Sequence, residues 1–228
     1  MEITKHIAIS LDNISDWCRK NNIPFDSGCE KYFRNLGSLL GLQLKSNMPM
    51  ITVHLFFDNA EKYPEEYILF CDFMADFFSQ LLENPQVSEQ QMKVTILGKW
   101  YNLPGRLVES LKNVIEATKD YSNYFVNFCI NYDGQEEILD ACKLIAKQVE
   151  LGKINAEMVT RENIKENLYS SYFLPPDIFL IYGEKKIPGL LLWDSVNSRI
   201  EFAEKSWMEF EEGDLVKFIG KLNRNLYK

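Results

Sequence analysis

The stretch K-H-I-A-I-S-L-D-N-I-S-D-W, residues 5–17, decides the fold of this 228-residue chain. Mostly branched apolar residues run from His6 to Leu11 without a helical period and stop at Asp12. This pattern is typical of a buried strand that ends in a carboxylate. In an open α/β sheet, ligands bind in the crevice outside the carboxyl ends of the strands. The sequence therefore places Asp12 where chemistry is expected.

Further apolar runs predict five more strands, which alternate with helical patterns. The strands are expected at residues 50–57, 92–97, 124–130, 178–182 and 199–202. Helices are expected from a cap at Asp26 or Ser27 to about residue 42, at 64–83, 104–118 and 135–151, briefly from Thr160, and at 212–227; residues 18–25 are expected to form a polar connector. This alternation predicts an α/β fold with a central, mostly parallel sheet of about six strands flanked by helices, in one domain across residues 1–228.

The expected helix at residues 64–83 is apolar around most of its circumference. Phe70, Phe73, Met74 and Phe77 are among its bulky side chains. A helix of this kind is buried on several sides or lines an apolar cavity. Plain core packing and a cavity wall are both open at this point.

The overall charge and the cysteine spacing exclude several classes of protein. A net charge of -8 with a pI near 5.0 argues against nonspecific nucleic-acid binding, which depends on neutralising phosphates. No apolar run reaches the roughly eighteen residues of a membrane span, and the N-terminus lacks the zones of a signal peptide, so the cytoplasm is the expected location. The five cysteines contain no C-x-x-C pair, which indicates neither a disulfide framework nor a zinc site.

Three blocks of the chain resemble the cis-prenyltransferases, the family of undecaprenyl diphosphate synthase. Members begin H-x-A-x-x-x-D-G-N-G-R-W, and His6, Ala8, Asp12 and Trp17 stand here at the same spacing. The family block N-Y-G-G-R-x-E-I matches N-Y-D-G-Q-E-E-I at 131–138. The block P-D-L-x-I-R-T-x-G-E-x-R-x-S-x-F-L-L-W matches P-D-I-F-L-I-Y-G-E-K-K-I-P-G-L-L-L-W at 176–193.

The resemblance implies a function and a set of site residues. The family joins an allylic diphosphate to isopentenyl diphosphate with Mg2+ bound at the first-strand aspartate, so Asp12 is expected to be the catalytic residue and metal ligand. It also implies a homodimer, or a heterodimer with a related chain, and peripheral membrane contact through a lipid product. The expected substrate-binding residues are Trp17, Asn131, Gly134, Lys185, Lys186, Arg199, Phe70, Phe73, Met74 and Phe77.

Several phosphate-binding positions of the family carry other residues in this chain. The arginine of D-G-N-G-R-W is Asp16, and its glycines are Asn13 and Ser15. Further polar residues of the family are replaced by Phe25, Cys29, Ala60 and Tyr63. The segment I-Y-G-E lacks the arginine of the family block I-R-T-x-G-E, and Pro188 stands in place of a serine. Arg199 replaces a metal-binding glutamate. Since two diphosphates bring about six negative charges, each lost cation weakens binding.

Three interpretations therefore stay open. In the first, the chain is a diverged enzyme with a short, branched or cyclised product, and Lys185, Lys186, Lys62 and Arg19 contact phosphates. In the second, it is an inactive subunit of a heteromeric cis-prenyltransferase, with Arg224 answering a C-terminal arginine of such subunits. In the third, it is a binding protein that keeps only the fold. A Cys29 and His54 pair lacks any motif of nucleophilic catalysis, and a buried thiol and strand histidine explain these residues better.

Overall fold

The computed structural model describes residues 4–55, 57, 60–213, 215–217 and 220. Six strands form one sheet in the order β3-β4-β2-β1-β5-β6, and every neighbouring pair is parallel. The strands are β1 (His6–Ser10), β2 (Met50–Leu55), β3 (Met92–Leu97), β4 (Tyr124–Ile130), β5 (Ile178–Ile181) and β6 (Arg199–Phe202). The predicted α/β fold with a parallel six-stranded sheet is confirmed.

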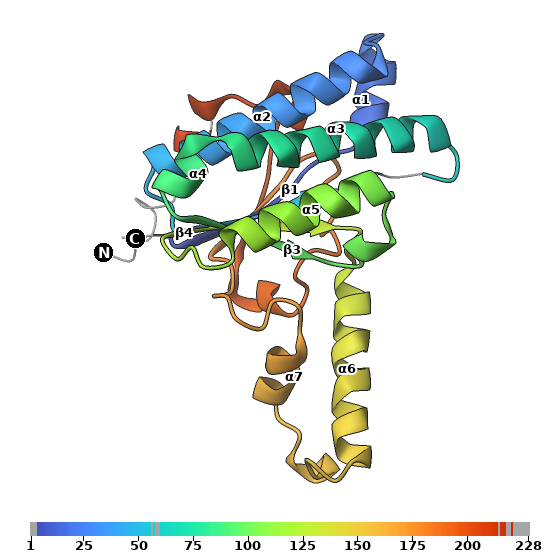
Figure 1. Cartoon of the computed structure of the whole chain (residues 1–228), viewed down its shortest axis with the longest axis vertical. Coiled ribbons are helices and arrows are strands. Elements are labelled where there is room, and N and C mark those ends of the chain that lie inside the picture. The colour runs from blue at the N-terminus through green and yellow to red at the C-terminus, as the bar shows by residue number, and fades with distance from the viewer. Residues whose placement is uncertain (1–3, 56, 58–59, 214, 218–219, 221–228) are drawn as a thin grey trace.

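Helices connect the strands and supply the outer layers (Figure 1). They are α1 (Ile14–Asn21), α2 (Phe25–Lys45), α3 (Pro64–Glu83), α4 (Pro85–Glu89), α5 (Gly105–Thr118), α6 (Gly134–Glu150) and α7 (Arg161–Asn167). Two of them start with sequences that favour a helix N-terminus. Pro64 with Glu65 and Glu66 forms the first turn of α3, and Thr160 and Asn163 form a capping box on α7.

Both faces of the sheet are buried, by different layers. Ile7 and Ile9 of β1 point into the larger core, which α2, α3 and α5 cover. Ala8 points to the other face, into a smaller core that Phe173 and Leu190 help to form. Alternate residues of a strand point to opposite faces, so burial of both explains the nearly continuous apolar runs of the sequence.

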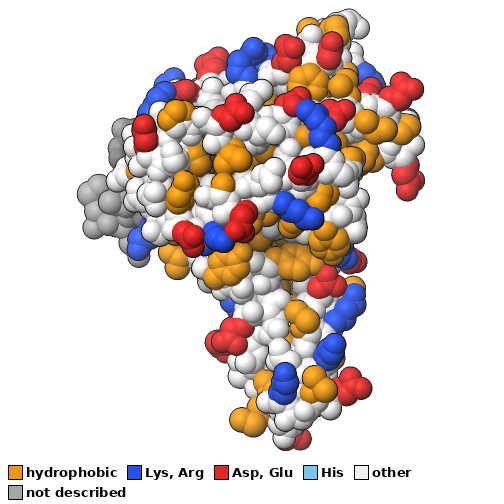
Figure 2. All heavy atoms as spheres, in the orientation of Figure 1, with side chains coloured by type: hydrophobic (Ala, Val, Ile, Leu, Met, Phe, Trp, Pro, Cys, Tyr) orange, Lys and Arg blue, Asp and Glu red, His pale blue; other side chains and the backbone are white. Residues whose placement is uncertain are grey.

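Helices α6 and α7 extend away from the sheet as an arm (Figure 1). Lys165 of α7 anchors the arm to the segment before β6, because its Nζ lies 2.8 Å from both oxygens of the buried Asp194. Leu144, Leu151 and Met158 on the arm are exposed. Figure 2 shows apolar side chains scattered along the arm, while acidic and basic side chains alternate over α3 and α5.

Two sequence-based boundaries need correction, and one predicted helix is described only in part. Residues 14–21 form α1, where a polar connector was expected from residue 18, because Asn13 caps the helix and Ile14 and Cys18 bury one face of it. Helix α2 begins at Phe25 after Pro24 and has no side-chain cap, so Asp26 and Ser27 lie inside it. In the predicted helix at 212–227, residues 212, 213, 215–217 and 220 are helical. The remainder of that helix lies outside the described residues.

Candidate active site

The carboxyl ends of the central strands surround a polar cavity of about 620 Å³, which we call the rim cavity. The chain leaves β1 for β2 on one side, and β5 joins β1 on the other, so the crevice lies where a parallel sheet commonly binds ligands. Residues that line it include Asp12, Trp17, His54, Asp133, Gly183 and Glu184. The predicted position of Asp12 at this rim agrees with the structure.

Two segments that are distant in the sequence hold Asp12. Its Oδ1 accepts the backbone N–H of Trp207 at 2.8 Å, and the hydroxyl of Ser206 also hydrogen-bonds the carboxylate. Burial raises the pKa of Asp12, and these two hydrogen bonds partly oppose the rise. On the other side, a Cβ on Gly183 would lie 2.6 Å from the Asp12 Cβ, and its φ of +90° also favours glycine.

The start of α1 brings a carboxylate and an aromatic ring to the rim cavity. Trp17 lines the cavity, and the ammonium of Lys31 lies 5.1 Å from its ring centroid. Asp16, in the first turn of α1, also lines the cavity and forms a 3.7 Å ion pair with Arg19. A negative charge suits the first turn of a helix but repels a phosphate.

Arg19 of α1 contacts the start of α3. Its Nη2 lies 2.7 Å from both carboxylate oxygens of Glu66, and its guanidinium lies 3.7 Å above the ring of Tyr63. The Ser15 hydroxyl donates to the same carboxylate at 2.7 Å. Arg19 is therefore not among the described residues that line the rim cavity.

Acidic side chains outnumber basic ones among the described residues that line the rim cavity. The charged ones are Asp12, Asp16, Lys20, Asp133, Glu184 and Lys186. The Nζ of Lys186 lies 2.6 Å from Glu184, and both side chains are exposed. Lys185 is exposed and does not appear in the lining. The wall of this cavity is thus acidic on balance.

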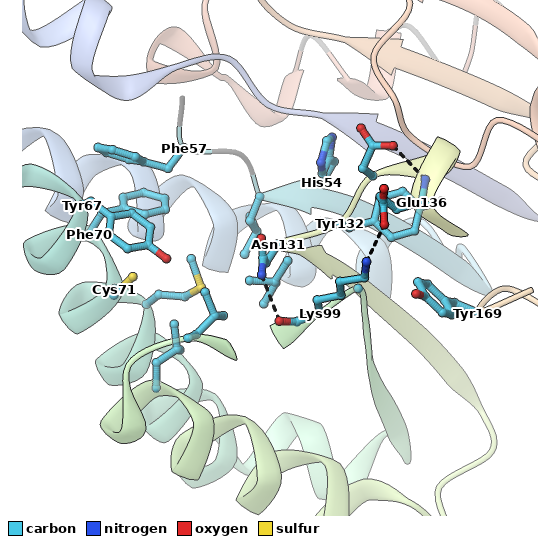
Figure 3. Close-up of a pocket in the computed structure, with 17 residues that line it drawn as sticks. His54, Phe57, Tyr67, Phe70, Cys71, Lys99, Asn131, Tyr132, Glu136 and Tyr169 are labelled. Atoms are coloured by element: carbon cyan, nitrogen blue, oxygen red, sulfur yellow. Dashed lines mark hydrogen bonds and ion pairs between the residues drawn. The ribbon is translucent and has the colours of Figure 1, made fainter. Parts of the chain in front are cut away.

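A second cavity of about 230 Å³ lies beside the first and has an apolar end (Figure 3). Its apolar wall comes mainly from α3 and α5 and contains Phe57, Tyr67, Phe70, Cys71, Met74 and Leu107. We call it the apolar pocket. His54 and Asp133 line both this pocket and the rim cavity, so the two cavities meet at these residues.

The predicted aromatic wall of α3 divides between two places. Phe70 and Met74 line the apolar pocket, in agreement with the cavity interpretation. Phe73 and Phe77 instead line a separate groove beside α2, where Phe33 stacks on Phe77 with ring centroids 5.6 Å apart. Only part of the predicted wall therefore borders the pocket.

The loops after β3 and β4 form the polar end of the apolar pocket. Asn131, at a φ of 47°, donates its side-chain amide to the Lys99 carbonyl at 2.9 Å. The Nζ of Lys99 lies 2.5 Å from Glu136. The Gly134 N–H donates to the Gly189 carbonyl at 2.7 Å, and a Cβ on Gly134 would lie 2.6 Å from that oxygen. Gly134 thus holds the wall of the rim cavity in place.

His54 stands where the two cavities meet, near the carboxyl end of β2. The ring is buried and packs edge-on against Tyr132, with centroids 6.0 Å apart. Burial lowers the pKa of His54 to about 4, although a hydrogen bond to the Tyr132 backbone opposes this. The Tyr132 hydroxyl donates to Glu137 at 2.5 Å and accepts the Leu191 N–H at 3.1 Å, which holds the ring in place.

Arg199 lies apart from the other predicted site residues within this chain. It begins β6, pairs in register with Ile178 at the amino end of β5, and is exposed. Its guanidinium lies 2.6 Å from Glu201. Sequence reasoning also missed residues that contact the predicted site residues. Ser206 and Trp207 follow β6 without a motif, and the partnership of Glu66 with Arg19 shows no sequence signal.

The described residues do not form a preassembled metal site. Among them, no three His, Cys, Asp or Glu side chains cluster closely enough to hold an ion. Asp12 is a lone carboxylate with Oδ1 used by Trp207. Mg2+ in phosphate-binding sites often takes one or two carboxylates and completes its shell with water and substrate phosphates. Asp12 fits an ion that arrives with a diphosphate rather than one held by protein alone.

At the rim of the parallel sheet, a cavity lined by charged side chains thus lies beside a pocket with an apolar wall. The family model described as "Putative undecaprenyl diphosphate synthase" matches residues 12–226. The chain therefore belongs to the undecaprenyl diphosphate synthase family of cis-prenyltransferases, and its similarity to these enzymes supports a prenyltransferase function.

Individual relatives agree along nearly the whole chain. The chain is 32% identical over 222 residues to a tritrans,polycis-undecaprenyl-diphosphate synthase (geranylgeranyl-diphosphate specific) of Thermoplasma volcanium, covering 96% of this chain and 86% of that protein. It is 29% identical to an isoprenyl transferase of Thermotoga maritima, covering 96% and 93%. The crystal structure of lavandulyl diphosphate synthase from Lavandula x intermedia shares the fold, with a TM-score of 0.88, 19% identity, and coverage of 96% and 94%.

In the part of the chain that the structure describes, no helix has the length and apolar character needed to cross a membrane.

Proposed function

We propose that the chain transfers an allylic prenyl group to isopentenyl diphosphate and makes a short product. The observation that carries this proposal is the meeting of the rim cavity and the apolar pocket at His54 and Asp133. A prenyl diphosphate has a charged head joined to an apolar chain. The rim cavity would take the diphosphate and the apolar pocket the growing chain.

The volume of the apolar pocket supports a short chain. A dry cavity of about 150 Å³ holds benzene, which corresponds to about 25 Å³ for each carbon atom. The apolar pocket of about 230 Å³ would then hold about nine carbon atoms. This is close to two isoprene units, so we expect products of about ten to fifteen carbons rather than long polyprenyl chains.

The residues of the rim cavity have distinct proposed roles. Asp12 would hold a Mg2+ ion that enters with a diphosphate, and that ion would offset phosphate charge as the leaving group departs. Lys20 and Lys186 are the cations in the described lining, and Lys185 lies on the same loop as Lys186. Trp17 would cover the substrate with its ring, since it lines the same cavity.

The acidic balance of the rim cavity favours a second candidate function. Asp16 stands where the family has an arginine, and Arg19 is held by Glu66. A pocket with this charge binds two diphosphates poorly. The chain would then be the inactive subunit of a heteromeric cis-prenyltransferase, stabilising a related chain that carries the complete phosphate site. In both cases we propose a dimer, either of like chains or with that related chain, and contact with membrane through the lipid product.

One experiment separates these functions. Purified protein is given allylic diphosphates of five, ten and fifteen carbons with isopentenyl diphosphate and Mg2+, alone and mixed with a motif-complete cis-prenyltransferase chain. The enzyme proposal predicts a short prenyl diphosphate from the protein alone, lost in Asp12→Ala. Product that appears only in the mixture supports the subunit. Without product or ligand-induced stabilisation in either case, a binding protein that keeps the fold alone is the remaining interpretation.

A further inference from the structure

We propose that Tyr132 is a positioning residue, whose buried hydroxyl holds one wall of the rim cavity in the shape that binds a diphosphate. The inference rests on the proposed prenyl transfer and adds a residue to that site. The wall is the loop of residues 184–189, which we call the strap. Its members in the lining of the rim cavity are Glu184, Lys186, Ile187, Pro188 and Gly189. Tyr132 lines the apolar pocket and is absent from the described lining of the rim cavity, so it acts there through the strap.

The strap lies between two backbone anchors. Before it, the Tyr182 N–H donates to the Ser10 carbonyl at 2.9 Å, which ties it to the end of β1. After it, the Leu191 N–H donates to the Tyr132 hydroxyl at 3.1 Å. Residues 183–187 between these anchors are exposed. The position of the exposed span therefore depends on the two anchors.

The backbone of Leu191 requires support from its surroundings. Its φ is 42°, a left-handed value that is uncommon for a bulky side chain, and the residue is fully buried. Such a conformation persists only where neighbouring contacts hold it. The Leu191 carbonyl accepts the N–H groups of Asp194 and Ser195, each at 3.0 Å, and the described partner of its N–H is the Tyr132 hydroxyl.

A closed ring of buried hydrogen bonds fixes the Tyr132 hydroxyl. This hydroxyl donates to Oε2 of Glu137 at 2.5 Å, and Oε1 of Glu137 accepts the Ser170 N–H at 3.1 Å. The Ser170 hydroxyl donates to Asp194 at 2.6 Å, and the Asp194 N–H returns to the Leu191 carbonyl. Because the tyrosine proton points to Glu137, the lone pairs of the hydroxyl oxygen are left for the Leu191 N–H. All five residues are buried, and a satisfied buried network of this kind is rigid.

The hydroxyl and the ring of Tyr132 serve different cavities. Lys186 on the strap is one of the two cations in the described lining of the rim cavity, so displacement of the strap removes a proposed phosphate contact. The Tyr132 ring lies at the polar end of the apolar pocket, beside His54 (Figure 3). Tyr132→Phe keeps that ring and removes only the hydroxyl. It therefore tests the strap while the wall of the apolar pocket stays in place.

The first measurement is diphosphate binding. Titration calorimetry with inorganic diphosphate and Mg2+ is expected to give a Kd about tenfold higher for Tyr132→Phe than for the wild type, or about 1.4 kcal/mol. The effect is partial because the Gly189 carbonyl still accepts the Gly134 N–H. In turnover, the KM of the diphosphate substrates is expected to rise by about the same factor, with kcat per folded molecule within about threefold. A general loss of folded protein lowers the apparent kcat and leaves KM unchanged.

The second measurement is hydrogen exchange, which does not depend on activity. In Tyr132→Phe, amides of residues 184–191 are expected to exchange about tenfold faster than in the wild type under native conditions. Amides of β1 and β2 are expected to exchange as in the wild type once the difference in global stability is taken into account. This contrast separates movement of the strap from loosening of the whole fold.

Two further variants complete the test. Tyr124→Phe also removes a tyrosine hydroxyl, but that hydroxyl is exposed, bonds to Asn47 and lies at the amino end of β4. Its Kd, KM and exchange are expected to equal those of the wild type. Ser170→Ala opens the same ring at Asp194 and is expected to change Kd and exchange in the same direction as Tyr132→Phe, by a smaller factor. If Tyr132→Phe does not fold, Ser170→Ala decides the outcome.

The outcomes separate this role from prenyl transfer. Wild-type Kd and wild-type exchange in Tyr132→Phe overturn the positioning role. A change in only one of the two also overturns it, because the strap then does not link the hydroxyl to the diphosphate. If the wild type binds diphosphate but makes no product, alone or with a related chain, prenyl transfer fails, and the comparison of Kd and exchange still decides the role of Tyr132. If the wild type does not bind diphosphate, both proposals fail.

Discussion

Acidification is expected to destabilise the fold through His6, which is buried below the rim in β1. Its Nδ1 lies 2.6 Å from the Leu174 carbonyl, and its Nε2 lies 2.7 Å from the Thr52 hydroxyl oxygen. Asn127 donates its side-chain amide to the same hydroxyl oxygen at 3.0 Å. The Thr52 proton then points to the imidazole, so the neutral ring with Nδ1–H toward Leu174 satisfies every group. A second proton on the ring breaks this chain.

The direction of the pH effect follows from the pKa of His6 in each state. Burial lowers the pKa of His6 from 6.5 to about 4. As the pH falls below 6.5, the imidazole of His6 becomes protonated in the unfolded chain but stays neutral in the folded protein. The free energy of unfolding therefore decreases until the pH nears 4. The free energy of unfolding falls by about 1.4 kcal/mol for each pH unit, which amounts to about 3 kcal/mol between the two pKa values of His6. About 2 kcal/mol of this is lost by pH 4.5.

Urea unfolding of the wild type and His6→Gln at pH 7 and pH 4.5 measures this contribution. The variant is expected to be less stable at pH 7, since glutamine replaces a well-bonded ring, but to lose about 2 kcal/mol less than the wild type on acidification. Titration of Glu137 and His54 is common to both proteins and cancels in the comparison. An equal loss in both proteins would refute the assignment of the acid effect to His6.

Three further changes test the packing around the site. Gly183→Ala is expected to lower the free energy of unfolding by about 1–3 kcal/mol, because the φ of +90° and the 2.6 Å approach to Asp12 both oppose a Cβ. Thermal unfolding measures this loss, and Gly213→Ala is the control because Gly213 has open space around it. Tyr132→Phe is expected to lower the free energy of unfolding by about 1–3 kcal/mol, because Glu137 and the Leu191 N–H both lose their hydrogen bond to the Tyr132 hydroxyl. Urea unfolding measures this loss. The control, Tyr124→Phe, removes an exposed hydrogen bond to Asn47 and is expected to change the free energy of unfolding little. Asp12→Asn is expected to keep stability within about 1 kcal/mol, since its amide oxygen still accepts the Trp207 N–H, but to lose prenyl transfer in the product assay.

The strands and the rim were predictable because their signals are local. Apolar runs that end before Asp12, Asp58 and Asn131 predict buried parallel strands, and the carboxyl ends of parallel strands meet at one edge. The same logic locates Gly183 after β5. The sheet is therefore available from the sequence even where the family motifs have changed.

The partners of the rim residues were not predictable, because their contacts span most of the chain. Trp207 reaches Asp12 across 195 positions, and Glu66 holds Arg19 across 47. Arg199 shows the opposite failure. A motif position suggests a site residue, but the strand register places it at the amino end of β6 within this chain. Helix α1 was missed because its apolar face contains few residues over a short length.

The contacts of Asp12 alter what its presence in the sequence means. A carboxylate that survives among changed neighbours suggests a retained metal ligand, yet this one also binds Trp207 and Ser206 and fits against Gly183. Those contacts alone are sufficient to retain an acceptor at this position in an inactive subunit. They do not require the charge, because an amide oxygen accepts the Trp207 N–H equally well in geometry. The comparison of Asp12→Asn with the wild type therefore separates a structural acceptor from a catalytic carboxylate, which the motif alone does not.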